Sequence, residues 1–185
     1  MMPTALSRRV AVSVFFFIAG CTFAVWASRI PHIQATLGLS KVMLDSVLFA
    51  LPIGLMVSLI AASGIITKLG SIKVMVFAAC MYSIVLVLLG FESTVWQLAG
   101  ALFLFGASGN LFNISVNAEA VGVEKLYGRS ILASFHGTWS LAEFTGAAVG
   151  TLMVSLRFQT WEHFVIVGIF CLIVTFIFAR KTLLA

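Results

Sequence analysis

The stretch VAVSVFFFIAGCTFAVWASRI, residues 10–30, is almost wholly apolar, and Arg29 near its end is its only charged residue. Because a helix rises about 1.5 Å per residue, roughly 20 apolar residues cross a hydrocarbon core about 30 Å thick. The stretch therefore predicts a membrane-spanning helix. Five further apolar stretches follow it, joined by short linkers. The six predicted spans are residues 10–30, 42–67, 72–90, 95–121, 130–156 and 162–179.

The composition also indicates an all-α membrane protein, arranged as a single six-helix transmembrane domain over residues 1–185. Hydrophobic residues make up 62% of the chain, charged residues make up 9%, and the mean hydropathy is +1.16. These values exclude a water-soluble globular domain. Arg8 and Arg9 could open a secretory signal peptide, but the apolar run after them is too long and leads to no cleavage site before a polar chain.

Basic residues are distributed unevenly between the two sides of the predicted spans. With the N-terminus in the cytoplasm, only Arg29, Lys41 and Arg157 of the 11 Lys and Arg residues face outside. The positive-inside rule therefore predicts a multi-pass protein of a bacterial-type inner membrane, with both termini cytoplasmic. The net charge of +5 is then a topology signal. A nucleic-acid partner is not expected, because no folded soluble surface carries a basic face.

No cofactor or metal is expected from the cysteine and histidine residues. The cysteines lie singly in three different spans, which provides neither a disulfide framework nor a CxxC motif. The histidines are scattered and lack metal-ligand spacing. These residues are Cys21, Cys80, Cys171, His32, His136 and His163.

The six predicted spans differ in character, which indicates where a cavity lies. The third and sixth spans are apolar all round, as expected for helices that face lipid. The fourth and fifth are richer in small and polar residues, and Gly146 and Gly150 form a GxxxG pair that allows close helix contact. We therefore expect the fourth and fifth spans inside the bundle. Pro52 and Gly54 predict a kink in the second span.

Polar side chains recur at helical spacing in the fourth and fifth spans. A charge at the bilayer centre costs about 3 kcal/mol even on insertion scales, so such residues usually mark function. Residues three or four apart share one face of a helix. Counted back from the turn between the two spans, the two polar faces match in depth. The predicted pairs are Asn117 with His136, Asn113 with Ser140, and Asn110 with Glu143.

Two interpretations of these polar residues stay open. Their hydrogen bonds could simply hold two helices together, each contributing about 0.6 kcal/mol. Alternatively, they line a substrate or proton site, for which Glu143 is the main candidate because it lies about 20 Å from the cytoplasmic end of its helix. Nearer the inner surface, Glu119 and Glu124 are expected to form salt bridges with Lys125 or Arg129.

Three stretches resemble the N-terminal six-helix half of a major facilitator superfamily (MFS) transporter, close to the fucose-permease-like branch. They are WASRIPHIQATLGLS at 26–40, NAEAVGVE at 117–124 and SFHGTWSL at 134–141. A fourth stretch, GIITKLGSIK at 64–73, is similar to a degenerate form of the superfamily's GxLaDRxGrr loop. The resemblance implies a conformational role for this loop, although Thr67 replaces its acidic residue. The candidate loop residues are Gly64, Lys68, Gly70 and Lys73.

The resemblance also implies two inverted three-helix repeats and alternating access. Such a half needs a partner besides the lipid bilayer, either a missing C-terminal half or a second copy, and truncation to the N-terminal half is the favoured explanation. In related sugar/proton symporters, acidic residues in the first and fourth spans are implicated in coupling. Ala27 and Asn113 stand there and carry no proton, which leaves Glu143 as the substitute.

The implied solute is a small, sugar-like molecule. Aromatic rings and amides could stack on it and hydrogen-bond to its hydroxyl groups. The candidate residues are Trp26, Trp139, Asn113 and Asn117. Each tryptophan could equally be a packing residue.

A rhomboid-like intramembrane serine protease is the alternative from a different class. Gly106, Ala107, Ser108 and Gly109 resemble that family's GxSG motif. A serine nucleophile needs a positioned imidazole, and the sixth span offers only His163 at its outer edge. We therefore expect a transporter rather than an enzyme. A non-transporting membrane partner or remnant is a third interpretation.

Overall fold

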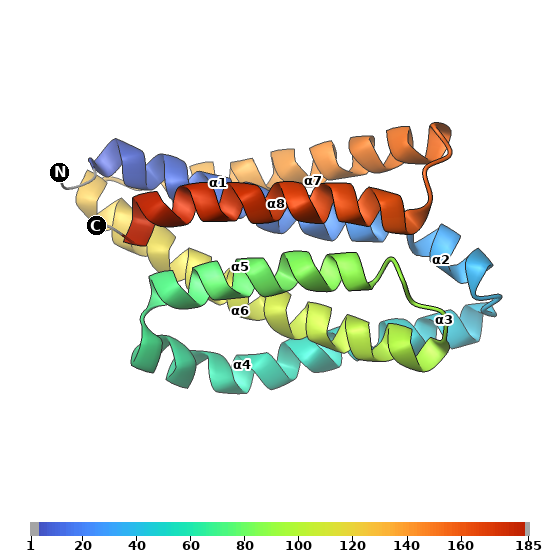
Figure 1. Cartoon of the computed structure of the whole chain (residues 1–185). Coiled ribbons are helices and arrows are strands. Elements are labelled where there is room, and N and C mark those ends of the chain that lie inside the picture. Colours follow the sequence, from blue (N-terminus) through green and yellow to red (C-terminus); the bar gives the residue numbers. More distant parts are fainter. Residues whose placement is uncertain (1–3, 184–185) are drawn as a thin grey trace.

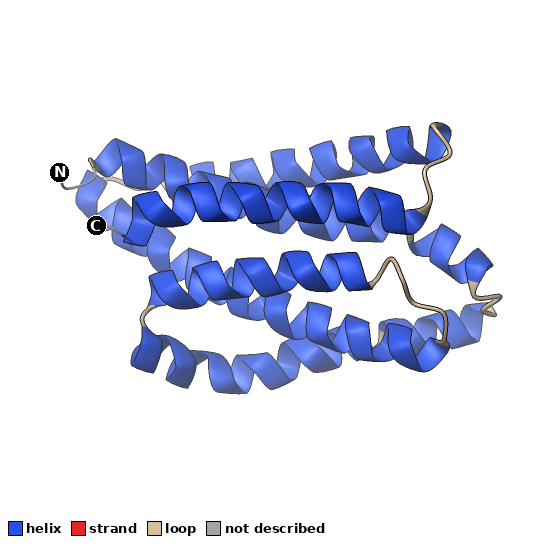
Figure 2. Cartoon of the chain, viewed as in Figure 1, coloured by secondary structure: helices blue, strands red, loops and turns tan. Residues whose placement is uncertain are grey.

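The computed structural model describes residues 4–183, with side chains as far as Arg180, so residues 1–3 and 184–185 of the predicted domain lie outside the described residues. Every regular element of the described chain is a helix (Figures 1 and 2). Both termini lie at one end of the bundle, here called the terminal end, and the opposite end is called the far end. The helices are α1 (Ala5–Ser28), α2 (Ile30–Thr36), α3 (Lys41–Leu48), α4 (Ala50–Leu69), α5 (Ser71–Leu88), α6 (Val95–Tyr127), α7 (Leu132–Ser155) and α8 (Thr160–Leu183).

Local sequence signals set where the long helix α6 begins and ends. The Thr94 hydroxyl accepts a hydrogen bond from the Gln97 amide at 3.3 Å, and the Gln97 side chain accepts one from the Thr94 amide at 3.1 Å. This capping box satisfies backbone donors at the helix start. Gly128 ends the helix in the left-handed conformation, with φ of 63°, where a residue without Cβ meets no steric penalty.

Prolines divide each of the first two spans into a long and a short helix. α1 and α2 meet at Arg29, just before Pro31, and α3 and α4 meet at Phe49, just before Pro52. Proline lacks an amide hydrogen, and its ring clashes with the carbonyl four residues earlier, so the helix is interrupted on its N-terminal side. The kink predicted around Pro52 and Gly54 thus lies at Phe49. Both breaks lie toward the far end (Figure 1).

The helices form two layers of three. α1, α7 and α8 make one layer, α4, α5 and α6 make the other, and α5–α8 and α1–α6 contacts join them (Figure 1). The pairing is symmetric, because α1 packs on α7 and α8 as α6 packs on α4 and α5. The first three and last three spans therefore form the 3+3 inverted repeat that the sequence predicts.

Small residues bring α1 and α7 close together. A Cβ added to Gly146 would lie 2.8 Å from the carbonyl oxygen of Cys21, and one added to Gly150 would overlap the Ser28 side chain. The GxxxG pair therefore does mediate close helix contact, as expected. Its partner, however, is the first span.

The apolar spans differ in how much of their surface is buried within the bundle. Within the described residues, five helices or helix pairs are long and apolar enough to cross a membrane. The most apolar part of the segment 41–69 is only 11% buried, whereas that of α5 is 44% buried. α5 packs on α6 and α8, so the contact with lipid that is expected of the third span is limited to its remaining face, where Phe77 and Ile84 are exposed. The 24-residue α7 is not among the five, since its polar residues lower its hydropathy.

Candidate functional site

A cavity of about 200 Å³ lies where the first five spans converge. Its lining is mostly aromatic and aliphatic, with two asparagine side chains. The fourth and fifth spans both contribute to it, through three of the predicted site residues, Asn110, Asn113 and Trp139. The lining residues are Phe23, Leu51, Leu55, Tyr82, Phe105, Gly106, Gly109, Asn110, Asn113 and Trp139.

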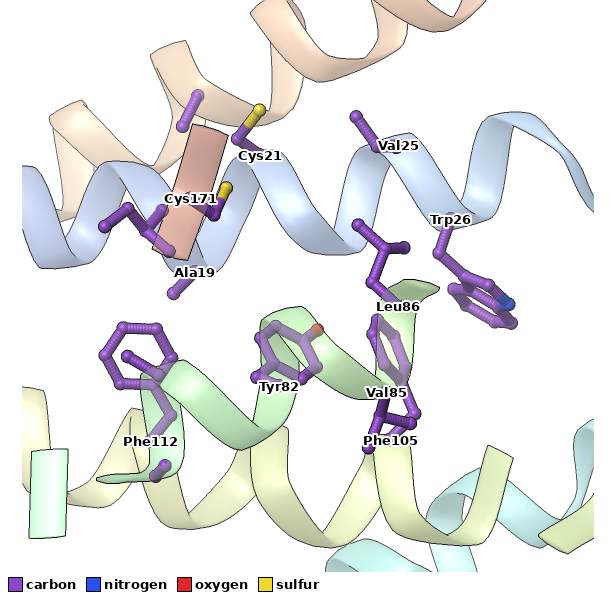
Figure 3. Packing of buried hydrophobic residues seen from close by; sticks show 14 of the residues in the cluster. Ala19, Cys21, Val25, Trp26, Tyr82, Val85, Leu86, Phe105, Phe112 and Cys171 are labelled. Carbon is purple, nitrogen blue, oxygen red and sulfur yellow. The ribbon is translucent and has the colours of Figure 1, made fainter. Parts of the chain in front are cut away.

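Stacked rings form one wall of this cavity. The rings of Tyr82 and Phe105 are stacked with centroids 4.3 Å apart, and Phe105 also contacts Trp26 at 5.5 Å (Figure 3). Gly109 makes room for the phenol, because a Cβ there would lie 2.8 Å from Cε2 of Tyr82. Trp26 is only 5% exposed and packs behind this wall. Tyr82 is absent from the sequence-based candidates because a single tyrosine in a uniformly apolar span gives no periodic signal.

Asn110 connects α6 to α4. Its side-chain amide donates to the Leu55 carbonyl at 3.2 Å and to the Ser58 hydroxyl at 2.9 Å. Both donor hydrogens are used by these bonds, so the amide nitrogen has none left for a solute. The structural interpretation of this asparagine therefore has direct support, although its side chain also borders the cavity.

Asn113 and Asn117 interact within α6. The Asn117 amide donates to the backbone carbonyl of Asn113 at 2.8 Å and to its side-chain oxygen at 3.0 Å. The side-chain NH₂ of Asn113 has no partner within residues 4–183 and borders the cavity. Asn113 is therefore the predicted residue that is best placed to donate a hydrogen bond to a solute.

The predicted pairs between the fourth and fifth spans do not form. α6 and α7 make few contacts with one another, because α7 packs along α1 while α6 packs on α4 and α5. Ser140 is exposed, and His136 is exposed with its ring edge on Phe16. Glu143 is half-buried against α1, where its Cγ lies 3.5 Å from the position a Cβ would take on Gly20. Residues that were predicted to lie at the same depth in the fourth and fifth spans are therefore not neighbours, because α6 and α7 do not pack along one another.

The loop at the terminal end joins α4 to α5 through Gly70, whose φ of 84° is in the region that glycine favours. Gly64, Lys68 and Lys73 are exposed there. Ser71, the first residue of α5, donates a hydrogen bond to the Glu119 carboxylate on α6. The start of α5 is thus connected to α6 through a hydroxyl group, and no ion pair joins this loop to α6 within the described residues.

Glu124 has a different partner from the one expected. Its carboxylate accepts hydrogen bonds from the backbone amides of Ile131 at 2.7 Å and Leu132 at 2.9 Å. These amides belong to the start of α7, so the carboxylate caps that helix. The salt bridges expected for Glu119 and Glu124 with Lys125 or Arg129 are absent from the described residues, because backbone and hydroxyl donors lie nearer.

A buried cation is the polar feature that the sequence analysis missed. Arg29 is 1% exposed, and its Nε donates to Nδ1 of His163, itself 0% exposed, over 3.1 Å. The nearby hydroxyl of Thr160 lies 2.9 Å from Nδ1 of His32. By sequence, Arg29 counts only as one basic residue outside the membrane. No pattern marks it as the partner of a histidine 134 positions away.

The serine of the protease-like motif is a structural residue of α6. The Ser108 hydroxyl donates to the carbonyl of Leu104 at 2.7 Å in its own helix, and the imidazole of His163 is engaged by Arg29. A nucleophile and its base are therefore not brought together. Within the described residues, no group of three His, Cys, Asp or Glu side chains could hold a metal ion.

Comparison with known proteins identifies transporter relatives, while no family model matches the chain. An uncharacterized transporter of Sinorhizobium fredii is 30% identical over 158 residues, which cover 85% of this chain and 42% of the relative. An uncharacterized MFS-type transporter of Yersinia pestis is 33% identical over 142 residues, 77% of this chain and 37% of the relative. The membrane protein MosC of Rhizobium meliloti is 26% identical over 136 residues, 74% of this chain and 33% of the relative. The chain thus spans less than half the length of these relatives.

Proposed function

We propose that this chain, which is homologous to MFS-type transporters over most of its length, is half of a secondary active transporter that moves a small solute by alternating access. The observation that carries the proposal is the cavity between the two inverted repeats, lined from both repeats by rings and by Asn113. Transporters of this architecture bind their solute near the midplane at a repeat interface. Homology to transporters also argues against an enzyme.

A second half is part of the proposal. α4 and α7 each leave an apolar face exposed, for example at Met56 and Ile60 on α4 and at Leu141 and Phe144 on α7. The same two helices also border the cavity, through Leu55 on α4 and Trp139 on α7. A helix that contacts only lipid on its outer side would not be expected to line the cavity. We propose that these faces pack on a C-terminal half or on a second copy of the chain, and that α8 faces the bilayer.

The proposed orientation places the terminal end in the cytoplasm of a cell with a bacterial-type inner membrane. It rests on the excess of basic residues in the segments at that end. We further propose proton symport. Glu143 supports this, because a carboxyl group half-buried against the first span is able to exchange a proton there. Reporter fusions at each terminus test the orientation.

The solute that we propose has an apolar face and few hydrogen-bonding groups directed at this half. A sugar-like ring meets this description if it stacks on Trp139 and accepts a hydrogen bond from Asn113. The other half of the cavity would then contact the remaining hydroxyl groups.

Uptake into proteoliposomes tests the proposal. We would compare the 185-residue chain with a form extended through any coding sequence downstream of residue 185, using a panel of labelled sugars, drugs and amphipathic acids. Uptake only by the extended form supports a C-terminal half as the partner, and uptake by the chain alone supports a second copy. If neither form moves any compound of the panel, the transport proposal fails.

A further inference from the structure

Two hydrogen bonds join the first and sixth spans at the far end of the bundle. Arg29 Nε donates to His163 Nδ1 over 3.1 Å, and the Thr160 hydroxyl lies 2.9 Å from His32 Nδ1. Arg29 and His32 are three residues apart, and so are Thr160 and His163, so each pair shares one side of its segment. The four residues form a closed cluster, here called the far-end clasp.

The Arg29–His163 contact fixes the protonation state of the imidazole. A guanidinium group only donates hydrogen bonds, so Nδ1 of His163 carries no proton while the contact exists. Both side chains are buried, and neither Nη2 of Arg29 nor Nε2 of His163 has a hydrogen-bond partner within the described residues. A proton on His163 would place two cations side by side away from water. Protonation and the contact therefore exclude each other.

Two carboxylates lie near the clasp, and within the described residues neither forms an ion pair with Arg29 or His163. Glu92, from the loop between α5 and α6, borders a cavity of about 100 Å³ together with His32 and Thr160, and burial raises its pKa. The carboxylate of Glu162 on α8 accepts a hydrogen bond from the backbone of Gln159 at 2.7 Å. From α7, the nearest residue is Gly150, where a Cβ would lie 3.8 Å from Cε1 of His163. α5 presents uncharged Ser83 and Val87 to α8.

We propose that His163 is a proton-binding site and that Arg29 converts its protonation into separation of the first and sixth spans at the far end. Arg29 is the joint between α1 and α2, so repulsion acts where the first span is already broken. The cavity bordered by His32, Glu92 and Thr160 lies beside the His32–Thr160 contact, whereas His163 is fully buried, so its ring meets a proton from water when the clasp opens. This site is separate from Glu143 and goes beyond the proposed function, because its test measures local opening and not transport.

Hydrogen–deuterium exchange tests the proposal on the 185-residue chain in lipid nanodiscs. After correction for intrinsic rates, we expect amides in 29–33 and 160–164 to lose about tenfold protection between about pH 7.5 and about pH 5.5. The size follows because a solvated imidazole in the opened state has an ordinary pKa of about 6.5, so one pH unit below that value multiplies the opened population about tenfold, while the closed state binds no proton. Amides in 98–105 of α6 serve as the internal reference. Unchanged protection at the clasp would overturn the proposal.

Matched variants locate the effect. His163→Gln keeps an oxygen that can accept from Arg29 but does not titrate, so the clasp should stay protected at both pH values. His32→Gln removes the other histidine of the clasp, which touches no guanidinium, and should retain the tenfold change. A tenfold change that survives His163→Gln overturns the proposal.

A second measurement covers the case in which His163→Gln does not give a folded, monodisperse protein. In the unaltered chain with labelled histidine, NMR should show the His163 ring without a proton on Nδ1 for as long as the clasp is closed, and protonated only where the clasp has opened. In Arg29→Gln, the repelling charge is gone, so protonation should no longer be accompanied by opening, and the change in protection should fall severalfold. Protonation of His163 with the clasp closed in the unaltered chain contradicts the proposal.

Discussion

Gly54 of α4 lies against the backbone of Phe103 on α6, so closely that a Cβ on Gly54 would overlap the Phe103 carbonyl oxygen. The contact is reciprocal, because a Cβ on Gly106 of α6 would overlap the carbonyl oxygen of Leu51 on α4. Each glycine lies against backbone atoms of the other helix. Backbone atoms cannot move away by a change of rotamer, as the end of a flexible side chain can. The two glycines therefore set the distance between the two helices.

We expect Gly54→Ala and Gly106→Ala each to destabilise the chain by about 1–3 kcal/mol, the usual range for overpacking. The measurement is thermal or denaturant unfolding in detergent. Gly64→Ala in α4 and Gly100→Ala in α6 are matched controls, because nothing lies within 4 Å of a Cβ at either position. They should change stability little or raise it, since alanine favours helix over glycine. Equal losses in all four variants would contradict the close contact.

The carboxylate of Glu124 should hold the start of α7 in place. Glu124→Ala removes the acceptor for the amides of Ile131 and Leu132, so residues 131–134 should exchange hydrogen severalfold faster while the rest of α7 is unaffected. Glu119→Ala is the control, because its carboxylate accepts from Ser71 at the start of α5 instead. Faster exchange of residues 131–134 in the control but not in Glu124→Ala would contradict this assignment.

Hydropathy was enough to predict every membrane-spanning helix except α7, because the requirement to cross an apolar slab acts on each segment by itself and the polar residues of α7 lower its hydropathy. It also indicated that Asn110 and Asn113 border a cavity, because small and polar residues are enriched in that span. Neither inference needs to know which helices are neighbours. The helix break near Pro52 could likewise be predicted from the sequence, because proline lacks an amide hydrogen and interrupts the helix that contains it.

Helix neighbours could not be predicted in the same way. Counting from the turn places Asn110 and Glu143 at one depth, but depth does not say which helix lies alongside. Gly146 and Gly150 direct α7 to α1, and the amide of Asn110 then finds its acceptors on α4. The Arg29–His163 contact is hidden for the same reason, since its partners come from the first and sixth spans.

Asn110 and Asn113 should have separable roles. Asn110→Ala breaks the bonds to Leu55 and Ser58, so it should lower stability by about 0.6–1.7 kcal/mol, the range measured for hydrogen bonds between membrane helices. Asn113→Ala leaves Asn117 its backbone acceptor, so stability should change little. In a transport-competent form, however, Asn113→Ala should raise KM severalfold. The reverse pattern in unfolding and uptake assays would assign the solute contact to Asn110.

Glu143 provides the sharpest test of proton symport. Its carboxyl group is half-buried beside Gly20 of the first span, so loading and release of a proton change the charge between α1 and α7. Glu143→Gln keeps the shape and remains neutral at every pH. In the transport-competent form, we expect uptake by this variant to lose most of its dependence on pH, with solute exchange retained. His136→Gln alters an exposed titratable residue two turns earlier on the same helix, and this variant should keep the pH profile of the unaltered protein. An unchanged pH profile in Glu143→Gln would remove this carboxyl group from any proton pathway and leave coupling to another group.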